Sequence, residues 1–242
     1  MISLLDVRKG FNLGKANEFI AVGGVTLTME ANRITVLKGP SGSGKTTLLR
    51  LIGCMARPTS GRIRLRGALL GDNRVLKDGN APEVEVTSLP ERFLTDIRRR
   101  TFGFIFQQFN LVKGISLLEN VMLPSYPLGE KHAFVKERAH ALLELFGLGS
   151  RTSARVEWLS GGEAQRAAIA RALMNNPPVI IADEPTAHLD SKLSMEFMEI
   201  IARLKEQGKT AIIASHDPLV FDAKMVDRVI AMRDGMIEGD AA

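Results

Sequence analysis

A glycine-rich segment constrains this chain more than any other feature of its sequence. Residues 39–46 read Gly-Pro-Ser-Gly-Ser-Gly-Lys-Thr, directly after an apolar run and directly before the helix-forming run 47–52. Glycines let the chain curl without Cβ clashes, and the start of a helix points backbone N–H groups at an anion. The order strand, loop, helix therefore predicts a phosphate-binding loop, although a glycine turn beside a stray lysine is the alternative. The residues that we expect to hold a nucleotide here are Gly39, Ser41, Gly42, Ser43, Gly44, Lys45, Thr46 and Thr47.

Lys45 and Thr46 have separate predicted roles in such a loop. The ammonium of Lys45 can reach the β- and γ-phosphates, and the hydroxyl of Thr46 is a ligand for Mg²⁺. A second acid is needed to hold the metal, and the run Val179 to Ala182 ends in Asp183 and Glu184. Because ligands collect at the carboxyl ends of parallel strands, we expect Asp183 to hold Mg²⁺ and Glu184 to act as general base. The alternative is a strand that simply meets a helix N-cap.

Composition places the chain among folded proteins and leaves two partner classes open. The 242 residues are 45% hydrophobic and 24% charged, which excludes disordered, collagenous and disulfide-scaffold chains. A single cysteine, Cys54, cannot form an internal disulfide and favours a reducing compartment. We find no apolar run of about 20 residues and no signal peptide, so we expect a cytoplasmic chain that does not cross a membrane. The net charge of +5 leaves nucleic acid or an anionic membrane surface as partners.

Short apolar runs alternate with longer amphipathic stretches, which predicts an α/β fold with a mostly parallel sheet. One amphipathic helix is expected between about 130 and 146, and another from Asp190 to Gly208. Both apolar stripes are expected to pack in the core. The strands are predicted at Ile2–Val7, Ile20–Met29, Arg33–Lys38, Arg62–Arg66, Gly103–Phe106, Val179–Asp183, Thr210–Ser215 and Arg228–Met232.

The chain divides into two predicted parts within one domain spanning residues 1–242. A core with a small β layer covers about 1–107 and 176–242, and an inserted helical subdomain covers about 108–175. Residues 67–90 are rich in Gly, Asp, Asn and Pro, and we expect a surface excursion there, such as a hairpin of the β layer.

The most specific motif is Leu159-Ser160-Gly161-Gly162-Glu163. Average residue frequencies give this pentapeptide by chance in about one such chain in two thousand. A serine and two glycines at a helix start form a second anion-binding site. If the first loop holds one ATP, this second site would serve another ATP or the same ATP from another subunit.

With these motifs in this order, nearly the whole chain resembles the ATP-binding cassette (ABC) ATPases. The resemblance implies a P-loop NTPase fold with a RecA-like core sheet, an antiparallel β layer and an inserted helical subdomain. It also implies ATP and Mg²⁺ as cofactors and a head-to-tail dimer of two copies. In such a dimer Ser160, Gly161 and Gly162 of one copy close over ATP held by Lys45 of the other.

Four further elements follow from the same resemblance. Gln107 would sense Mg²⁺ and the attacking water, and His216 would touch the γ-phosphate. Phe11 would stack on adenine, or else pack at a strand edge. The segment Ala187-His188-Leu189-Asp190 would cross the dimer interface, with His188 standing where asparagine is usual.

Within the family, Phe109-Asn110-Leu111 and Leu118-Glu119-Asn120-Val121 most resemble the branch of lipoprotein-releasing, macrolide-exporting and cell-division ATPases. That branch implies an ATP-hydrolysing subunit that lies on the inner face of the cell membrane and drives a separate integral membrane permease. Two alternatives stay open: an ATP-gated signalling module without transport, and an ATPase acting on nucleic acid. Arg92 and Arg98-Arg99-Arg100 would form a patch for the latter, but the absence of interleaved aromatics favours a solvated helix face, and we expect no nucleic acid partner.

Overall fold

The computed structural model describes residues 1–70, 82–187 and 189–241, and their strands form two sheets. The strands are β1 (Ile2–Phe11), β2 (Phe19–Met29), β3 (Ile34–Lys38), β4 (Ser60–Arg66), β5 (Glu83–Glu85), β6 (Phe102–Ile105), β7 (Val179–Asp183), β8 (Thr210–Ser215), β9 (Arg228–Arg233) and β10 (Met236–Ala241). The α-helices are α1 (Lys45–Ile52), α2 (Glu91–Thr101), α3 (Leu117–Met122), α4 (His132–Leu145), α5 (Gly161–Leu173), α6 (Ser191–Glu206) and α7 (Pro218–Phe221). Short 3-10 helices are η1 (Gly67–Leu70), η2 (Leu123–Leu128), η3 (Gly149–Arg151) and η4 (Val156–Trp158).

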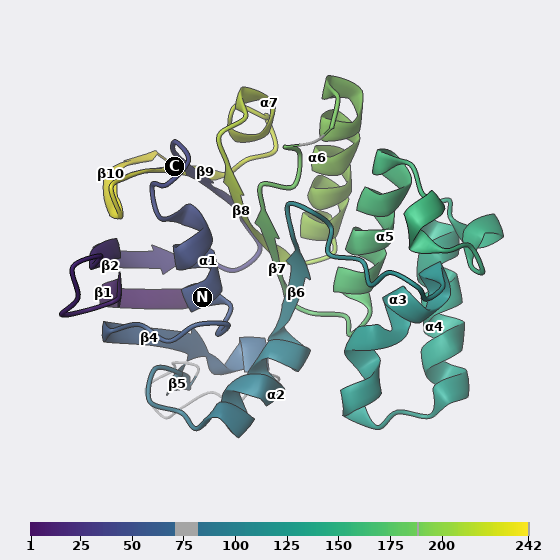
Figure 1. Cartoon of the computed structure of the whole chain (residues 1–242), viewed down its shortest axis with the longest axis horizontal. Coiled ribbons are helices and arrows are strands. Elements are labelled where there is room, and N and C mark those ends of the chain that lie inside the picture. Colours follow the sequence, from purple (N-terminus) through teal and green to yellow (C-terminus); the bar gives the residue numbers. More distant parts are fainter. Residues whose placement is uncertain (71–81, 188, 242) are drawn as a thin grey trace.

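The larger sheet has the order β10-β9-β3-β8-β7-β6 and runs through the centre of the molecule (Figure 1). Strands β9, β3, β8, β7 and β6 are parallel, and only β10 pairs antiparallel, with β9. The parallel register places Lys38 beside Ser215, and Asp183 beside Ala214. The segments that follow β3, β7 and β8 therefore leave the sheet at the same edge, where ligands of open α/β sheets bind.

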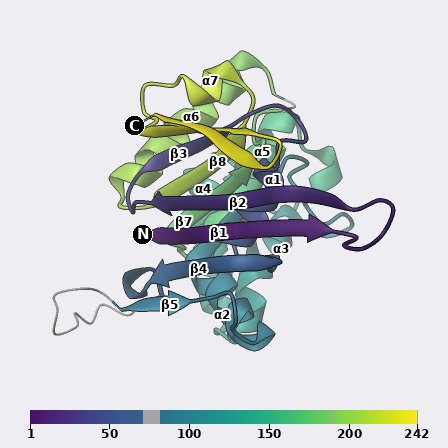
Figure 2. The same cartoon turned by 90° about the vertical axis from the view of Figure 1, so that its left-hand side faces the viewer.

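The smaller sheet is antiparallel, with the order β2-β1-β4-β5, and it faces the viewer in Figure 2. Its buried residues Leu4, Val22, Ile63 and Leu65 belong to the same apolar cluster as Leu48 and Ile52 of α1. Helix α1, which begins in the glycine-rich loop, is thus packed between the two sheets. The predicted α/β fold with a mostly parallel core sheet and an antiparallel β layer is confirmed.

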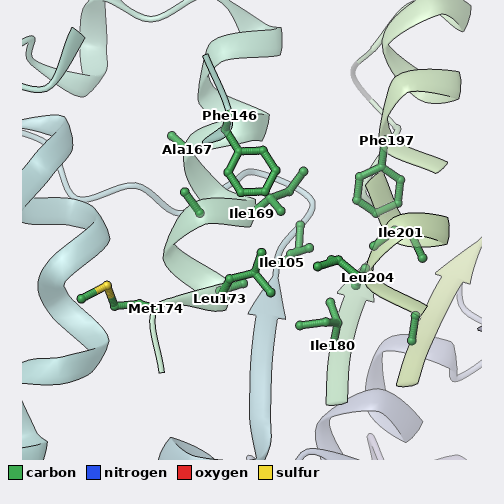
Figure 3. Close-up of a cluster of buried hydrophobic side chains, with 14 of the residues drawn as sticks. Ile105, Phe146, Ala167, Ile169, Leu173, Met174, Ile180, Phe197, Ile201 and Leu204 are labelled. Carbon is green, nitrogen blue, oxygen red and sulfur yellow. The ribbon is translucent and has the colours of Figure 1, made fainter. Parts of the chain in front are cut away.

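A second apolar cluster joins the other face of the large sheet to the helices (Figure 3). Ile105 and Ile180 come from strands, Leu173 from α5, and Phe197 and Ile201 from α6. The stripes predicted on α4 and α6 are indeed core faces, since Val135, Ala139, Leu143, Phe197 and Ile201 are at most 2% exposed. Asp190 caps α6 by accepting a hydrogen bond from the Leu193 backbone N–H, as the predicted helix start requires.

Several predicted strand limits were wrong. Strand β1 continues past Val7 to Phe11, and its residues stay paired with β2 beyond register shifts that begin near Asp6, whose φ is 45°. The prediction missed β5, which has only three residues, two of them glutamates, and also β10, whose pattern is interrupted at Gly239 by a register shift. Strand β3 begins at Ile34 rather than Arg33, and β6 spans Phe102–Ile105 rather than Gly103–Phe106.

The structure can be compared with only part of two predictions, the helical subdomain at 108–175 and the surface excursion at 67–90. Strands β6 and β7 are parallel neighbours, so the chain between them, with α3, α4 and α5, departs from the sheet and returns to it. This supports the proposed helical subdomain at 108–175, whose boundaries stay a prediction. Within the excursion at 67–90, residues 71–81 lie outside the described residues, while its end carries β5, which pairs antiparallel with β4.

None of the helices in the described residues has the length and apolarity to span a bilayer.

Candidate functional site

The glycine-rich loop connects β3 to α1. It lies against β2, β9 and the turn between β9 and β10. Gly44 precedes α1 with φ of 95°, and a Cβ atom on it would lie 2.3 Å from the carbonyl oxygen of Ala21. A side chain on Gly39 would meet the Met232 carbonyl oxygen at 2.2 Å. Only glycine fits these two places, since any Cβ would clash with a backbone that cannot move away. The loop glycines thus have the conformational role that the sequence predicts.

A cavity of about 330 Å³ opens over this loop, which is the size of a small ligand site. Its walls include three predicted residues from elsewhere in the chain, Gln107, Glu184 and His216. Three residues of β2 that the sequence analysis missed, Phe19, Ile20 and Ala21, also line it. The loop contributes Ser41, Gly42, Ser43, Gly44, Lys45, Thr46 and Thr47.

Lys45 is the charged centre of the cavity. Its side chain is 5% exposed, and its Nζ donates to the carbonyl oxygens of Gly39 at 2.6 Å and Pro40 at 3.0 Å. The same Nζ lies 3.3 Å from a carboxylate oxygen of Glu184. A buried ammonium costs free energy unless it is paired, so these contacts hold it where an anion can replace them.

Glu184 and His216 form the second contact of the site. Nδ1 of His216 lies 2.9 Å from Glu184 Oε2, and the imidazole is 62% exposed whereas the carboxylate is 13% exposed. Glu184 follows β7 with a φ of 46°, a left-handed conformation that is costly outside glycine. The structure thus maintains a strained backbone that places this carboxylate between the lysine and the histidine.

The arrangement of Thr46 and Asp183 fits a magnesium ion. Thr46 Oγ1 donates to Asp183 Oδ1 at 2.8 Å, and burial raises the pKa of Asp183. Hydroxyl and carboxylate oxygens are ligands that Mg²⁺ prefers, and it usually keeps water and substrate phosphates as its other ligands. The described residues contain no group of three or more His, Cys, Asp or Glu placed to hold a metal.

A buried polar atom also fits a phosphate. In the described part of the chain, the Ser43 hydroxyl is buried without a hydrogen-bond partner, although its backbone is fixed by bonds to Pro40 and Gly235. Such a group costs free energy until an acceptor or donor reaches it. The loop therefore presents this hydroxyl, the Lys45 ammonium and the N-terminus of α1 to one place, which suits the phosphates of a nucleotide.

The second glycine motif lies apart from this cavity. Ser160 caps α5, its hydroxyl accepts from the Glu163 backbone N–H at 3.3 Å, and Glu163 accepts in return from the Ser160 N–H at 2.8 Å. This reciprocal capping box explains why α5 begins at Gly161. Ser160, Gly161 and Gly162 do not line the cavity that contains Lys45. One chain therefore does not bring the two predicted phosphate sites together.

The three remaining predictions, on Phe11, His188 and the arginine cluster, have different outcomes. Phe11 does not line the cavity; its ring stacks on that of Phe19 with 5.1 Å between centroids. His188 lies outside the described residues. In the arginine cluster of α2, Arg98 donates to Glu91 and to the Cys54 carbonyl oxygen, and Arg100 pairs with Asp96. Two of the four arginine side chains, Arg98 and Arg100, are thus bound within the chain itself and need no nucleic acid to account for them.

Comparison with known proteins identifies the family of this site. The family model described as "ABC transporter" matches residues 22–187, which include both glycine motifs and the two carboxylates. The chain belongs to the ABC transporter family. The predicted family is thereby confirmed, and the chain is an ABC-type ATPase.

ABC relatives cover the chain from end to end. An uncharacterized ABC transporter ATP-binding protein of Thermotoga maritima is 40% identical over 99% of this chain and 94% of its own length. The macrolide export ATP-binding/permease protein MacB of Rhodospirillum rubrum is 39% identical over 100% of this chain but only 34% of its own length. The chain thus spans about a third of the MacB proteins that it matches. The resemblance to the branch that contains macrolide exporters is confirmed.

Solved structures agree with the ABC fold. The ATP-binding cassette MJ0796, in a dimeric post-hydrolysis state bound to ADP and Pi, has a TM-score of 0.83 and 35% identity over 100% of this chain and 98% of the solved chain. A second dimeric structure of MJ0796, described as a bacterial ABC transporter cassette, has a TM-score of 0.83 and 36% identity over the same coverage.

Proposed function

We propose that this chain is the ATP-hydrolysing subunit of an ABC transporter or related mechanical complex, and that two copies close head to tail around two ATP. A single observation carries this proposal: Lys45, Glu184 and His216 meet at the glycine-rich loop, whereas Ser160 to Gly162 lie outside the cavity. The first set is the chemistry of phosphoryl transfer, and the second set has no phosphate to bind within its own chain.

Lys45 and the start of α1 would bind the triphosphate. When phosphate oxygens replace the carboxylate and carbonyl oxygens around Lys45, its charge stays paired and faces the negative charge that grows during transfer. The Ser43 hydroxyl then gains the partner that it lacks. Binding therefore costs little rearrangement of the protein.

Glu184 would accept the proton of the attacking water. Its displacement from Lys45 frees a carboxylate oxygen, while Nδ1 of His216 holds the other at 2.9 Å and fixes its direction. Proton transfer to a positioned carboxylate typically accelerates such steps by about 10² to 10⁴. Gln107, which lines the same cavity, would hold the water and reach the metal.

Thr46 and Asp183 would hold Mg²⁺, with Gln107 near it. The ion, when bound, neutralises charge on the β- and γ-phosphates. The 2.8 Å contact between Thr46 Oγ1 and Asp183 Oδ1 keeps both oxygens at the end of β7 before the ion arrives.

The membrane part of the proposal rests on the relatives. The MacB protein of Rhodospirillum rubrum is named as an ATP-binding/permease protein, and this chain matches a third of it. We infer that an integral membrane permease acts with this chain and that the chain lies at the inner face of the membrane. The proposed dimer follows the dimeric MJ0796 structures.

Substitution of Glu184 by Gln tests the assignment of the base. The amide keeps the size of the side chain but cannot accept the proton, so we expect ATP binding to persist while ATP turnover falls at least about 100-fold. Turnover and nucleotide affinity of the purified variant are measured side by side. Normal turnover by Glu184→Gln would show that another group is the base.

A further inference from the structure

Gln165 is the polar side chain among the buried residues of α5. It is 3% exposed, and its helix neighbours Ala167 and Ile169 belong to the apolar cluster of the core (Figure 3). An amide in such a place costs free energy unless it is hydrogen-bonded. Its Nε2 donates to the carbonyl oxygen of Pro185 at 3.3 Å. Helix α5 is thereby bonded to the residue that follows Glu184.

The segment after β7 has to pair its carbonyl groups without a neighbouring strand. The carbonyl oxygen of Glu184 accepts from the Ala187 N–H at 3.3 Å, and that of Thr186 accepts from the Leu189 N–H at 3.0 Å. Both of these bonds are internal to the segment, whereas the bond to the Pro185 carbonyl oxygen comes from a side chain of another element. Helix α5 thus holds this segment from outside.

The backbone held in this way is the strained backbone of the site. Glu184 has a left-handed φ of 46°, a conformation that persists only where surrounding contacts maintain it. Its N–H donates to the Ala214 carbonyl oxygen at 2.9 Å, and two residues later Thr186 Oγ1 donates to Asp217 Oδ2 at 3.2 Å. The bond from Gln165 acts between these two contacts. Its loss would let the backbone at Glu184 relax and turn the carboxylate away.

The first turn of α5 packs on the continuation of the same segment. A Cβ atom on Gly162 would lie 2.9 Å from a methyl carbon of Leu193, and one on Gly161 would lie 3.9 Å from a methyl carbon of Leu189. Gly161 and Gln165 are four residues apart, so they lie on the same face of the helix. The start of α5 is therefore connected, within one chain, to the segment that carries the proposed base.

We propose that Gln165 is a positioning residue for Glu184. Its amide, through the Pro185 carbonyl oxygen, maintains the left-handed backbone that directs the carboxylate toward Lys45 and His216. The inference rests on the proposed function, since it takes Glu184 as the general base. Gln165 does not line the cavity over the phosphate loop, so it acts only through the segment that it holds.

Two substitutions of Gln165 remove the amide donor in different ways. Gln165→Met keeps the length of the side chain, and Gln165→Ala suits a helix that is already rich in alanine. Both variants should lower kcat for ATP about 10-fold while KM stays within about 2-fold, because a misplaced base slows hydrolysis without removing phosphate contacts. Steady-state ATPase assays of the purified proteins provide both constants.

A double-variant cycle with Glu184→Gln separates positioning from structural support. If Gln165 acts through Glu184, then adding Gln165→Met to Glu184→Gln should leave the residual turnover unchanged. Asn175→Leu is the matched control, because the Asn175 amide also donates to a proline carbonyl oxygen, that of Pro124, at 2.9 Å. This control should lower the melting temperature at least as much as Gln165→Met, yet keep the kcat of the unsubstituted chain.

Other outcomes would overturn the proposal. Unchanged kcat in Gln165→Met would show that the bond is not needed, and a loss confined to Gln165→Ala would assign the effect to packing volume. Equal losses from Gln165→Met with and without Glu184→Gln would make Gln165 a structural residue. Normal turnover by Glu184→Gln alone would instead contradict the base assignment on which the proposed function and this inference both rest.

Discussion

Glu163 couples protonation to the stability of the helix that begins at the second glycine motif. It accepts hydrogen bonds from the backbone N–H and the hydroxyl of Ser160 and pairs with Arg151 at 3.1 Å. The Ser160 backbone bond, followed by the bonds from Arg151 and the Ser160 hydroxyl, lowers the pKa of Glu163 from 4.5 to about 2. Because the folded-state pKa is below the unfolded one, this stabilisation is complete above pH 4.5 and is lost as the pH falls toward 2.

Replacement of Glu163 by Gln should reveal that pH window. At pH 7 the variant should lose about 1 kcal/mol of unfolding free energy, the usual value of a helix cap. Near pH 2.5 the difference from the unsubstituted chain should be smaller, since the carboxyl group is then partly protonated. Urea unfolding at both pH values provides the measurement. A loss that is equal at both pH values would show that the charge of Glu163 has no part in the cap.

At the residue scale, sequence reasoning is most specific where a motif fixes local backbone chemistry. Lys45, Thr46, Asp183 and Glu184 follow from spacing alone, because a phosphate loop and the end of a parallel strand each require particular residue types. Phe19 was missed, because an aromatic residue in a β-strand normally packs in a sheet. The structure shows that this strand borders the cavity, since Phe19, Ile20 and Ala21 line it and the Ala21 carbonyl oxygen lies against Gly44.

At the scale of elements, Arg171 connects α5 to the segment after β6. Its guanidinium donates to the carbonyl oxygens of Asn110 at 2.5 Å and Phe109 at 2.6 Å, and both of these residues have left-handed φ angles. Burial lowers the pKa of Arg171. Helix α5 is thereby connected to the segment that follows Gln107.

Replacement of Arg171 by Met should loosen this connection. The carbonyl oxygens of two residues with left-handed φ angles would lose a charged donor. We therefore expect a loss of about 2 kcal/mol of unfolding free energy and faster amide exchange at residues 107–112. Arg155→Met is the matched control, because that arginine is exposed and should change neither quantity. Unaltered exchange at 107–112 in Arg171→Met would mean that the strained segment is held by other contacts.

Strand limits were the least predictable part of the fold. Strand β10 pairs with β9 on both sides of a register shift between Ile237 and Gly239, and Gly235 in the turn before it donates to the Ser43 carbonyl oxygen and accepts from the Gly23 N–H. A short strand with a glycine and two acids carries a weak β signal, and its role depends on contacts with distant residues. Helices α4 and α6 were predictable because their apolar spacing alone selects the buried face.

At the scale of the whole molecule, we propose that the two phosphate sites of one chain complete two different composite sites of a dimer. Lys45 and Glu184 face one cavity, while Ser160 to Gly162 are outside it, so each completed site in our account needs two copies. The dimeric MJ0796 structures, at 35% and 36% identity, support this arrangement. The capping box on Ser160 fixes the start of α5 within the single chain.

ATPase assays of two mixed dimers, purified through different affinity tags, test this arrangement most directly. One dimer pairs Lys45→Ala with Ser160→Asp, and the other pairs the double variant with the unsubstituted chain. Aspartate still caps a helix but repels a triphosphate. Head-to-tail assembly predicts activity in the first dimer, where one composite site is intact, and none in the second, where both are damaged. Activity in the second dimer but not in the first would place each complete site within one chain and contradict the account.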